Sequence, residues 1–242
     1  MKIRDYAAYG FDDINPFTNY QKEMDRIIGA LEGVPRLLLH ACCGPCSSYC
    51  LEYLSQYFEI TVFYYNPNIW PSDEYDLRIA EQKLIIAHTK AVHPIHLVEG
   101  AYDTSRYYRA VRGLEDEPEG GRRCHTCYRL RLEEAARVAA ALSFDYFTTS
   151  LTISPMKDPH VLNAVGRAAG EKYGVRYLNS DFKKKNGYRR SVEIARALDV
   201  YRQDYCGCIF SKRSRDAKHY GNDEALGTAG RSGATLAVAD HS

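Results

Sequence analysis

The chain has 242 residues, of which 45% are hydrophobic and 26% charged, and its formal net charge is +1. This composition is that of an ordinary globular protein, and the length suffices for one domain with extensions. The charge excludes a surface that is basic overall, although it leaves room for a local basic patch. Because no run of about 18 apolar residues occurs, the sequence predicts no membrane-spanning helix and no membrane partner.

Short apolar runs alternate along the chain with longer stretches of helical periodicity. The runs that predict strands are residues 37–40, 60–65, 96–98, 144–149 and 175–178. The stretches that predict helices are residues 16–32, 49–58, 72–89, 101–112, 128–142, 158–172 and 191–198. Strands that alternate with helices favour an α/β fold, in which helices flank a mainly parallel sheet.

These elements divide the chain into three expected parts. Residues 1–32 form an N-terminal extension with one amphipathic helix, and residues 33–215 form a single α/β domain that carries the functional site. Residues 216–242 are rich in small and polar side chains and show little pattern, so we expect a flexible tail there.

Seven of the eight cysteines fall in three tight groups that lie far apart in the sequence. The groups are Cys42, Cys43 and Cys46; Cys124 and Cys127; and Cys206 and Cys208. This pattern predicts a fold that brings the three remote segments together at one site. The eighth cysteine, Cys50, lies in a helical run and is expected to be a small buried apolar residue.

The chemistry of these groups depends on the compartment and on the number of thiols. The first residues lack the long apolar stretch of a secretory signal peptide, so we expect a cytoplasmic protein, in which clustered cysteines indicate metal or redox chemistry. A zinc ion takes four ligands, a set that Cys43, Cys46, Cys124 and Cys127 could supply. Seven thiols exceed that need, which favours an iron–sulfur cluster with a second metal or a redox thiol pair.

The first cysteine group lies on a predicted strand-to-helix turn, between residues 37–40 and 49–58. Exposed backbone N–H groups at such a turn favour negative charge, including that of thiolates. Residues 149–154 also follow a predicted strand. Since ligands of parallel sheets bind beyond the carboxyl ends of the strands, we expect both segments to reach one crevice.

Five residue strings of the chain form a distinctive series. They are HACCGPC (40–46), RCHTCYRLRL (123–132), TSLTISPMKD (149–158), FKKKNGY (182–188) and YRQDYCGC (201–208). Together they resemble the cobalamin-independent epoxyqueuosine reductases of the QueH type, in the order of that family and over roughly residues 36–211. Met156 stands where an aromatic residue is expected, a departure that touches no cysteine.

The resemblance implies a fold and a reaction. The fold is an α/β core similar to HUP-class nucleotide-binding domains. The reaction is the last step of queuosine biosynthesis, in which an oxidoreductase removes the epoxide oxygen from epoxyqueuosine at the wobble position of tRNA. The implied partners are that tRNA and an electron donor that the sequence does not identify.

The resemblance also implies a [4Fe-4S] cluster and no cobalamin. The implied cluster ligands are Cys42, Cys43, Cys124 and Cys127. Cys46 is an alternative ligand or part of a second metal site. Cys206 and Cys208 form a redox-active pair or hold a second, mononuclear metal such as iron. A disulfide across two positions this close closes a very small ring and is easily reduced, which suits catalysis better than structure.

Two further sets of side chains have expected roles in this reaction. The candidates for proton delivery are Tyr205 and Asp158, together with Tyr188 and Lys157. The candidates for contact with tRNA phosphates are Lys183, Lys184, Lys185, Arg189 and Arg190. The basic set stands out because the rest of the chain is close to neutral, and lysine and arginine supply the phosphate contacts of RNA-binding proteins.

Two other functions compete with this one. A tRNA sulfur-transfer enzyme also combines an α/β core with cysteine pairs, but it would need an ATP-cradling glycine-rich loop after the first strand. This chain has ACCGPC there, which counts against that activity. A zinc-stabilised RNA-binding protein is the non-enzymatic alternative. Anaerobically purified protein separates the two metals, since a cluster is brown and zinc is colourless.

Overall fold

The computed structural model describes residues 5–217, and its five strands form one all-parallel sheet. The strands are β1 (Arg36–Ala41), β2 (Glu59–Tyr64), β3 (Ile95–Glu99), β4 (Tyr146–Thr149) and β5 (Arg176–Tyr177). Their order across the sheet is β3-β2-β1-β4-β5. The predicted α/β class with a parallel sheet is confirmed.

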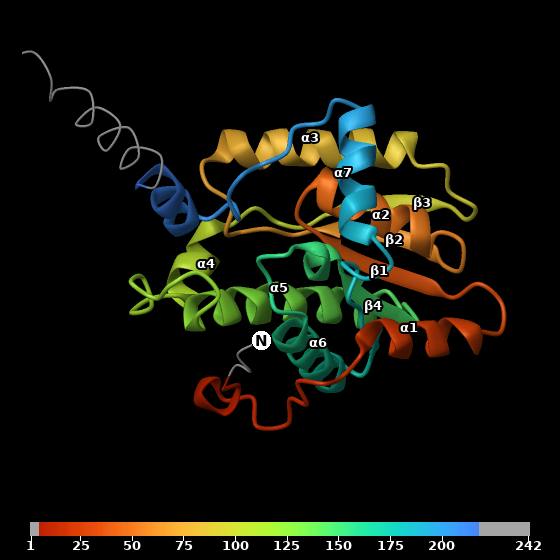
Figure 1. Cartoon of the computed structure of the whole chain (residues 1–242), viewed down its shortest axis with the longest axis horizontal. Helices are drawn as coiled ribbons and strands as arrows, with labels where there is room; N and C mark the ends of the chain where they lie inside the picture. The colour runs from red at the N-terminus through yellow and green to blue at the C-terminus, as the bar shows by residue number, and fades with distance from the viewer. Residues whose placement is uncertain (1–4, 218–242) are drawn as a thin grey trace, which may run out of the picture.

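Helices cover both faces of this sheet (Figure 1). The α-helices are α1 (Tyr20–Gly29), α2 (Gly44–Leu54), α3 (Ser72–His88), α4 (Thr104–Ala110), α5 (Arg122–Ala141), α6 (Pro159–Tyr173) and α7 (Gly187–Ala197). Short 3-10 turns occur at η1 (Ala7–Tyr9) and η2 (Ser150–Ile153), and residues 209–217 are also helical. Apolar side chains of α1, α2, α3 and α7 share one core with the sheet, and those of α5 and α6 share another.

The central strand shows why its sequence is apolar without alternation. Leu37 and Leu39 of β1 pack into the core beneath α2, whereas Leu38 packs into the core beneath α5 and α6. Successive side chains of a strand point to opposite faces, and both faces of this sheet are covered. A continuous apolar run is therefore what a buried parallel strand requires.

Two helices begin earlier than the sequence predicted. α5 begins at Arg122 and α7 at Gly187, and not at residues 128 and 191, whereas α2 begins at Gly44, next to the proline that signals a helix start. A proline in the first turn of α2 is compatible with a helix start, because its missing N–H would have no partner there in any case. The prediction that Cys124 and Cys127 lie before the helix is wrong, since both are in the first turns of α5.

The order of the strands creates a crevice at the carboxyl ends of the central strands. From β1 the chain builds outward through β2 and β3, and it then returns to the other side of β1 to build β4 and β5. The carboxyl ends of β1 and β4 thus flank a topological switch point, where α/β proteins bind their ligands. The first cysteine group follows β1, and η2 follows β4, as the sequence predicted.

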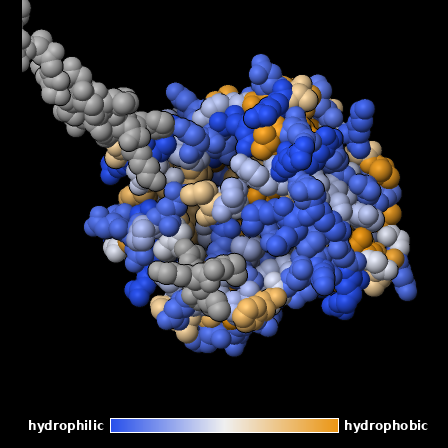
Figure 2. Space-filling view, in the orientation of Figure 1, coloured by the Kyte–Doolittle hydropathy of each residue, from blue (hydrophilic) through white to orange (hydrophobic). Residues whose placement is uncertain are grey.

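The surface and the ends of the chain add two observations. No helix within residues 5–217 is long and apolar enough to cross a membrane. Figure 2 shows a largely hydrophilic face with small, separate hydrophobic patches. Of the predicted tail, only residues 216 and 217 belong to the described residues, and the proposed division into three parts stays a prediction.

Candidate active site

The first cysteine group occupies the turn between β1 and α2. The Sγ atoms of Cys42, Cys43 and Cys46 all lie within 4.8 Å of one another, and those of Cys42 and Cys43 are 3.8 Å apart. Cys42 and Cys43 are 6% and 1% exposed, and Cys46 is half-buried. Cys50, one turn further along α2, is fully buried among apolar side chains, which confirms its predicted structural role.

This turn is shaped by a close approach of two helices. A Cβ atom at Gly44 would lie 2.6 Å from the carbonyl oxygen of Glu81 in α3, so only glycine lets the two backbones come this near. The N-cap of α2 is Cys43 itself, in an extended conformation with φ −165°. The contact between α2 and α3 therefore determines where the thiols of this turn lie.

The three thiols differ in their affinity for protons. Hydrogen bonds from Cys43 and Cys46 stabilise the thiolate of Cys42 and hold its pKa well below the usual range, and Arg131 and Lys157 act in the same direction. Burial raises the pKa of Cys43 to about 12. Hydrogen bonds to Cys42 and Cys43 raise the pKa of Cys46. The hydrogen bonds within the group therefore make Cys42 the most acidic of the three thiols.

The second cysteine pair lies at the start of α5. Cys124 and Cys127 are three residues apart, so they share one face of the helix. Cys124 accepts a hydrogen bond of 3.2 Å from the backbone N–H of Gly120, and it packs against the apolar cluster that contains Cys42 and Cys43. Cys127 instead packs beside Cys208 in a separate cluster. The pair therefore lies between the other two groups.

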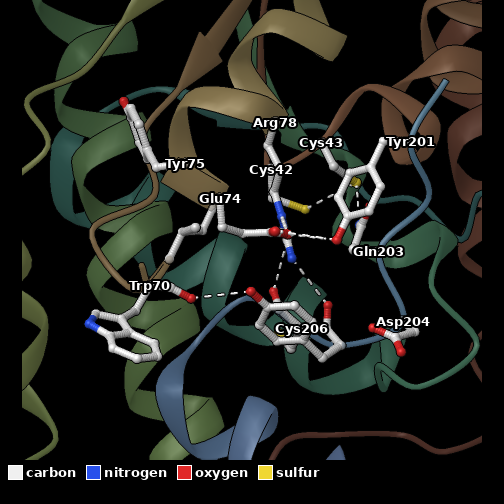
Figure 3. Close-up of polar contacts among 12 residues, drawn as sticks. Cys42, Cys43, Trp70, Glu74, Tyr75, Arg78, Tyr201, Gln203, Asp204 and Cys206 are labelled. Carbon is white, nitrogen blue, oxygen red and sulfur yellow. Dashed lines mark hydrogen bonds and ion pairs between the residues drawn. The ribbon is translucent and has the colours of Figure 1, made fainter. Parts of the chain in front are cut away.

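The third group lies on an irregular segment that side chains of α3 hold in place (Figure 3). Arg78, only 1% exposed, donates hydrogen bonds to the carbonyl oxygens of Tyr205 and Cys206 at 3.3 and 3.2 Å. The guanidinium is paired with Glu74 at 2.7 Å, and Glu74 also accepts a hydrogen bond from the Tyr201 hydroxyl. One buried ion pair thus anchors the segment that carries Cys206 and Cys208.

The loop before α3 completes this anchorage (Figure 3). The Tyr205 hydroxyl donates to the carbonyl oxygen of Trp70 at 3.2 Å. The backbone N–H of Trp70 donates to the carbonyl oxygen of Gly207 at 2.9 Å. Gly207 has φ +115°, and a Cβ atom there would lie 2.9 Å from a guanidinium nitrogen of Arg78. Glycine is therefore needed between the two cysteines, both for its conformation and for space.

A cavity of about 170 Å³ opens between these segments. Its walls include Cys42, Cys46 and Cys206, so the first and third cysteine groups face the same space. Gln203 also lines the cavity and links the two groups, because its side-chain amide donates to the Cys43 sulfur at 2.8 Å. At the rim, Met156 is 70% exposed. The cavity is open to solvent beside sulfur atoms, as a catalytic pocket requires.

The candidates for proton delivery lie in different surroundings. Lys157, Tyr188 and Tyr205 line the cavity, whereas Asp158 is not among its lining residues. Burial disfavours the charged form of Lys157, but Cys206, Tyr128 and Cys42 outweigh burial and raise its pKa. Burial raises the pKa of Tyr205 to about 12. Both groups therefore keep their protons at neutral pH.

The contacts of Asp158 are those of a helix cap. Its carboxylate is the N-cap of α6, accepting a hydrogen bond of 2.9 Å from the His160 N–H and one of 3.1 Å from the Tyr6 hydroxyl. An aspartate before a proline at a helix start is a capping pattern that the sequence itself contains. Its catalytic role stays a prediction that these contacts do not favour.

Most of the predicted tRNA-binding residues form ion pairs within the chain. The pairs are Lys183 with Asp181 at 3.0 Å, Lys185 with Asp25 at 2.8 Å, Arg189 with Glu193 at 3.0 Å and Arg190 with Glu52 at 2.7 Å. Within residues 5–217, Lys184 forms no ion pair. The set lies at or near the start of α7, and α7 supplies Tyr188 to the cavity.

The thiols of the first group could hold a metal. None of the eight cysteines forms a disulfide, so the seven grouped thiols are not blocked by a covalent bond to one another. Soft thiolates select zinc or iron–sulfur clusters and disfavour magnesium or calcium. Among residues 5–217, the group that could hold a metal ion with atoms within 4.8 Å of one another is Cys42, Cys43 and Cys46.

Three arginines are buried near these thiols, Arg78, Arg123 and Arg131, and none has a counterpart in the sequence-based prediction. Arg78 anchors the third cysteine group, and Arg131 lies on α5 one turn beyond Cys127. An arginine in an amphipathic helix is usually exposed, so periodicity gives no reason to expect burial. The one available signal was the spacing of Glu74 and Arg78, which suits an ion pair on a helix.

Comparisons with known proteins show the family to which this sequence is related. A family model described as epoxyqueuosine reductase QueH matches residues 37–214. Proteins named epoxyqueuosine reductase QueH are similar over most of their length. The one from Streptococcus pyogenes serotype M1 is 43% identical over 226 residues, which cover 88% of this chain and 89% of the relative.

Similarity extends to more distant bacteria. The protein of that name from Staphylococcus aureus is 38% identical, with 81% of this chain and 85% of the relative covered. The one from Thermotoga maritima is 33% identical, with 76% and 93% covered. The segment matched by the family model contains all seven grouped cysteines and the whole parallel sheet apart from the first residue of β1. The chain therefore belongs to the epoxyqueuosine reductase QueH family.

Proposed function

We propose that this protein reduces epoxyqueuosine to queuosine at the wobble position of tRNA, as the last step of queuosine biosynthesis. The names of its relatives support this reaction. The observation that carries the proposal is the convergence of thiols from two remote segments, Cys42 with Cys46 and Cys206, on one cavity at the switch point of the sheet. The turn after β1 reads ACCGPC and lacks the glycine-rich loop that an ATP-dependent tRNA sulfur-transfer enzyme would need there.

The reaction defines what the cavity must supply. Two C–O bonds of the epoxide break, a carbon–carbon double bond forms, and the oxygen leaves as water. The balance requires two electrons and two protons. Oxidation of two thiols to one disulfide releases the same number of each. An electron donor of unidentified nature then has to reduce that disulfide before the next turnover.

Cys206 and Cys208 are our candidates for this redox pair. Cys206 lies in the cavity wall, and the glycine between the two cysteines lets the chain bend sharply there. A small disulfide ring is strained and is reduced easily, as a catalytic pair must be. The alternative is that Cys206 and Cys208 hold a mononuclear iron, with Cys46 as a further candidate ligand.

We further propose a [4Fe-4S] cluster and no cobalamin. The cluster ligands are Cys42, Cys43, Cys124 and Cys127. Support comes from the packing of Cys124 against the apolar cluster of Cys42 and Cys43. When bound, such a cluster passes electrons one at a time, so it complements a two-electron thiol pair.

The packing of Cys127 beside Cys208 favours a different assignment of the cluster ligands. Cys206 also interacts electrostatically with both Cys124 and Cys127. In that assignment, Cys124, Cys127, Cys206 and Cys208 would hold the cluster, and the group after β1 would be the reactive one. Single substitutions separate the two assignments, because each predicts a different set of variants that lose iron.

The protein's own side chains position the substrate and deliver protons. Lys157 lines the cavity and remains protonated, so it can donate a hydrogen bond to the epoxide oxygen and then a proton. Tyr205 is the second candidate, and its hydroxyl would first have to leave the carbonyl oxygen of Trp70. Lys183, Lys184, Lys185, Arg189 and Arg190 are proposed to hold tRNA phosphates. The ion pairs of Lys185, Arg189 and Arg190 are exposed and contribute little to stability, so phosphates can replace their carboxylate partners. Lys183 is held more firmly, because Asp181 is buried and Lys183 also donates to the carbonyl oxygen of Thr152 at 2.8 Å.

The test is anaerobic reconstitution with iron and sulfide, followed by incubation with epoxyqueuosine-tRNA and a chemical reductant. Nucleoside analysis is expected to show queuosine. A thiolated nucleoside would instead indicate sulfur transfer. Colourless protein that binds zinc and RNA without turnover would indicate the RNA-binding alternative.

The ligand set is tested on the same protein. Cys124→Ser and Cys127→Ser are each expected to lose most of the bound iron and the broad visible absorbance. Cys50→Ala is the matched control, because Cys50 is fully buried away from the cavity and should keep both. Full iron and colour in both serine variants would eliminate the proposed ligands.

A further inference from the structure

Arg131 is a buried cation at the base of the thiol site. It lies on α5, four residues after Cys127 and on the same helix face, and is 1% exposed. Its Nε donates to the Nε2 atom of His40 at 3.3 Å, and a terminal nitrogen donates to the side-chain oxygen of Asn66. His40 lies near the carboxyl end of β1, and Asn66 lies two residues beyond the end of the neighbouring strand β2.

All of these partners are neutral. Nε2 of His40 lies 3.3 Å from the Nε of Arg131 and 3.2 Å from the carbonyl oxygen of Tyr65, and Nδ1 lies 2.9 Å from the Thr149 hydroxyl. The ring is fully buried beside the guanidinium, and both conditions favour its uncharged form. Asn66 is oriented by its own bond to the carbonyl oxygen of Ala41 at 2.9 Å.

A comparison with Arg78 shows that Arg131 lacks a carboxylate partner within residues 5–217. Both arginines are 1% exposed, and Glu74 lies 2.7 Å from Arg78. Arg123 at the start of α5 has no carboxylate partner in this range either, but its guanidinium contacts backbone carbonyls and the ring of Phe210.

A buried charge without a counter-charge is costly, so the site is expected to supply an anion. The neighbouring groups that can become anionic are thiols. Cys127 lies one helical turn before Arg131 on the same face of α5, and His40, which contacts Arg131, lies two residues before Cys42. Arg131 therefore lies beside the first two cysteine groups, and the interaction with Cys127, Cys42 and Cys206 raises its pKa against the effect of burial.

We propose that Arg131 is the fixed counter-charge of the thiolate-held metal centre, and that its charge raises the reduction potential of that centre without serving as a ligand. This inference rests on the proposed function, which places a redox-active iron centre among these thiols. A positive charge held in a low-dielectric interior favours the state with one more electron. Arg131 is thus a positioning residue, and the hydrogen bonds to His40 and Asn66 hold it in place.

The experiment compares the midpoint potential of the reconstituted cluster in four proteins by anaerobic redox titration, followed through visible absorbance. Arg131→Gln keeps hydrogen-bonding capacity but removes the charge, and its potential is expected to shift to a more negative value. Arg131→Lys keeps the charge, so its midpoint potential should stay close to that of the wild type. Arg137→Gln is the matched control, because Arg137 lies on the same helix with a side chain that is 52% exposed, and it should match the wild type.

The outcomes separate this inference from the proposed function. If the wild type carries a cluster and Arg131→Gln has the same potential, only the inference is overturned. Loss of iron in Arg131→Gln but not in Arg131→Lys supports it, since the charge is then what retains the centre. Unfolding or loss of iron in both variants overturns it, because packing would then account for the residue. Wild-type protein without bound iron overturns the proposed cofactor itself and this inference with it.

Discussion

The two cysteine segments that line the cavity are positioned by different means. Cys42, Cys43 and Cys46 lie where β1 passes directly into α2, and a close backbone contact with α3 fixes the turn. Cys206 and Cys208 lie in neither a helix nor a strand. Their segment is held by side-chain and loop hydrogen bonds to α3 and to the residues that precede it.

This difference matches the chemistry that we propose for each segment. A ligand group should keep its geometry through turnover, and regular structure packed on a helix provides that. A redox pair forms and breaks a bond between its sulfur atoms, which requires local movement. Segments with few regular backbone bonds open at lower free energy than strands and helices, so the Cys206–Cys208 segment is the better suited to this role.

The largest expected effect is the loss of turnover when the thiols of the second segment are removed. In the double variant Cys206→Ser, Cys208→Ser, turnover should fall to the level of a protein-free control while the cluster absorbance remains. Single-turnover nucleoside analysis and visible spectra of the same sample measure both. Wild-type turnover would remove any catalytic role for the pair. If Cys208→Ser loses the cluster and Cys42→Ser keeps it, the two segments exchange roles.

The next largest effect removes the anchor of the second segment. Arg78→Met leaves Glu74 without its partner, with the Glu74 side chain 11% exposed, so unfolding should become easier by about 3–5 kcal/mol. Urea denaturation measures this loss, and trypsin should cleave faster after Arg202. The additional change Glu74→Gln should recover part of the stability. Stability equal to that of the wild type would mean that other contacts hold the segment.

A smaller effect is expected from the contact that fixes the first segment. Gly44→Ala forces α2 away from Glu81, and overpacking of this kind costs about 1–3 kcal/mol. Gly29→Ala is the control, since a Cβ atom there meets nothing within 4 Å. Urea denaturation and iron content are measured together. Equal stability of the Gly44 and Gly29 variants would show that the turn does not depend on this approach.

The smallest effect concerns the charges that flank the two segments. Replacing Lys183, Lys184, Lys185, Arg189 and Arg190 by glutamine should weaken tRNA binding and flatten its salt dependence, by about 0.7–0.9 in slope for each phosphate that the variant no longer binds. Lys212→Gln with Arg213→Gln provides the comparison beside the second cysteine segment. An unchanged slope in the first variant and a flatter one in the second would move the proposed tRNA path to that side.

The sequence predicted most reliably what depends on local pattern. The apolar run of β1 and the cysteines that follow it indicated a strand-to-helix turn at a sheet crevice, and the structure has one there. The helix starts were harder, because glycine and cysteine are weak helix formers and conceal the first turns of α5 and α7. Cys124 and Cys127 were therefore expected in a loop, although they lie on a helix.

Roles that depend on distant contacts could not be predicted. Nothing adjacent to Arg131 in the sequence indicates that it will contact His40 and Asn66, because these partners come from β1 and from the loop after β2. Gln203 contacts the Cys43 sulfur across the cavity for the same reason. The basic residues near α7 were predicted from charge alone, and their carboxylate partners come partly from α1 and α2.

The distribution of the thiols along the chain has a consequence for biosynthesis. Domains fold progressively from the N-terminus as the ribosome adds residues. The sheet needs only residues up to β5, but the cavity also needs Cys206 and its anchor to Arg78. The nascent chain therefore builds its scaffold well before it can close the site. We expect metal loading to follow release from the ribosome, with the early thiols exposed to oxidation until then.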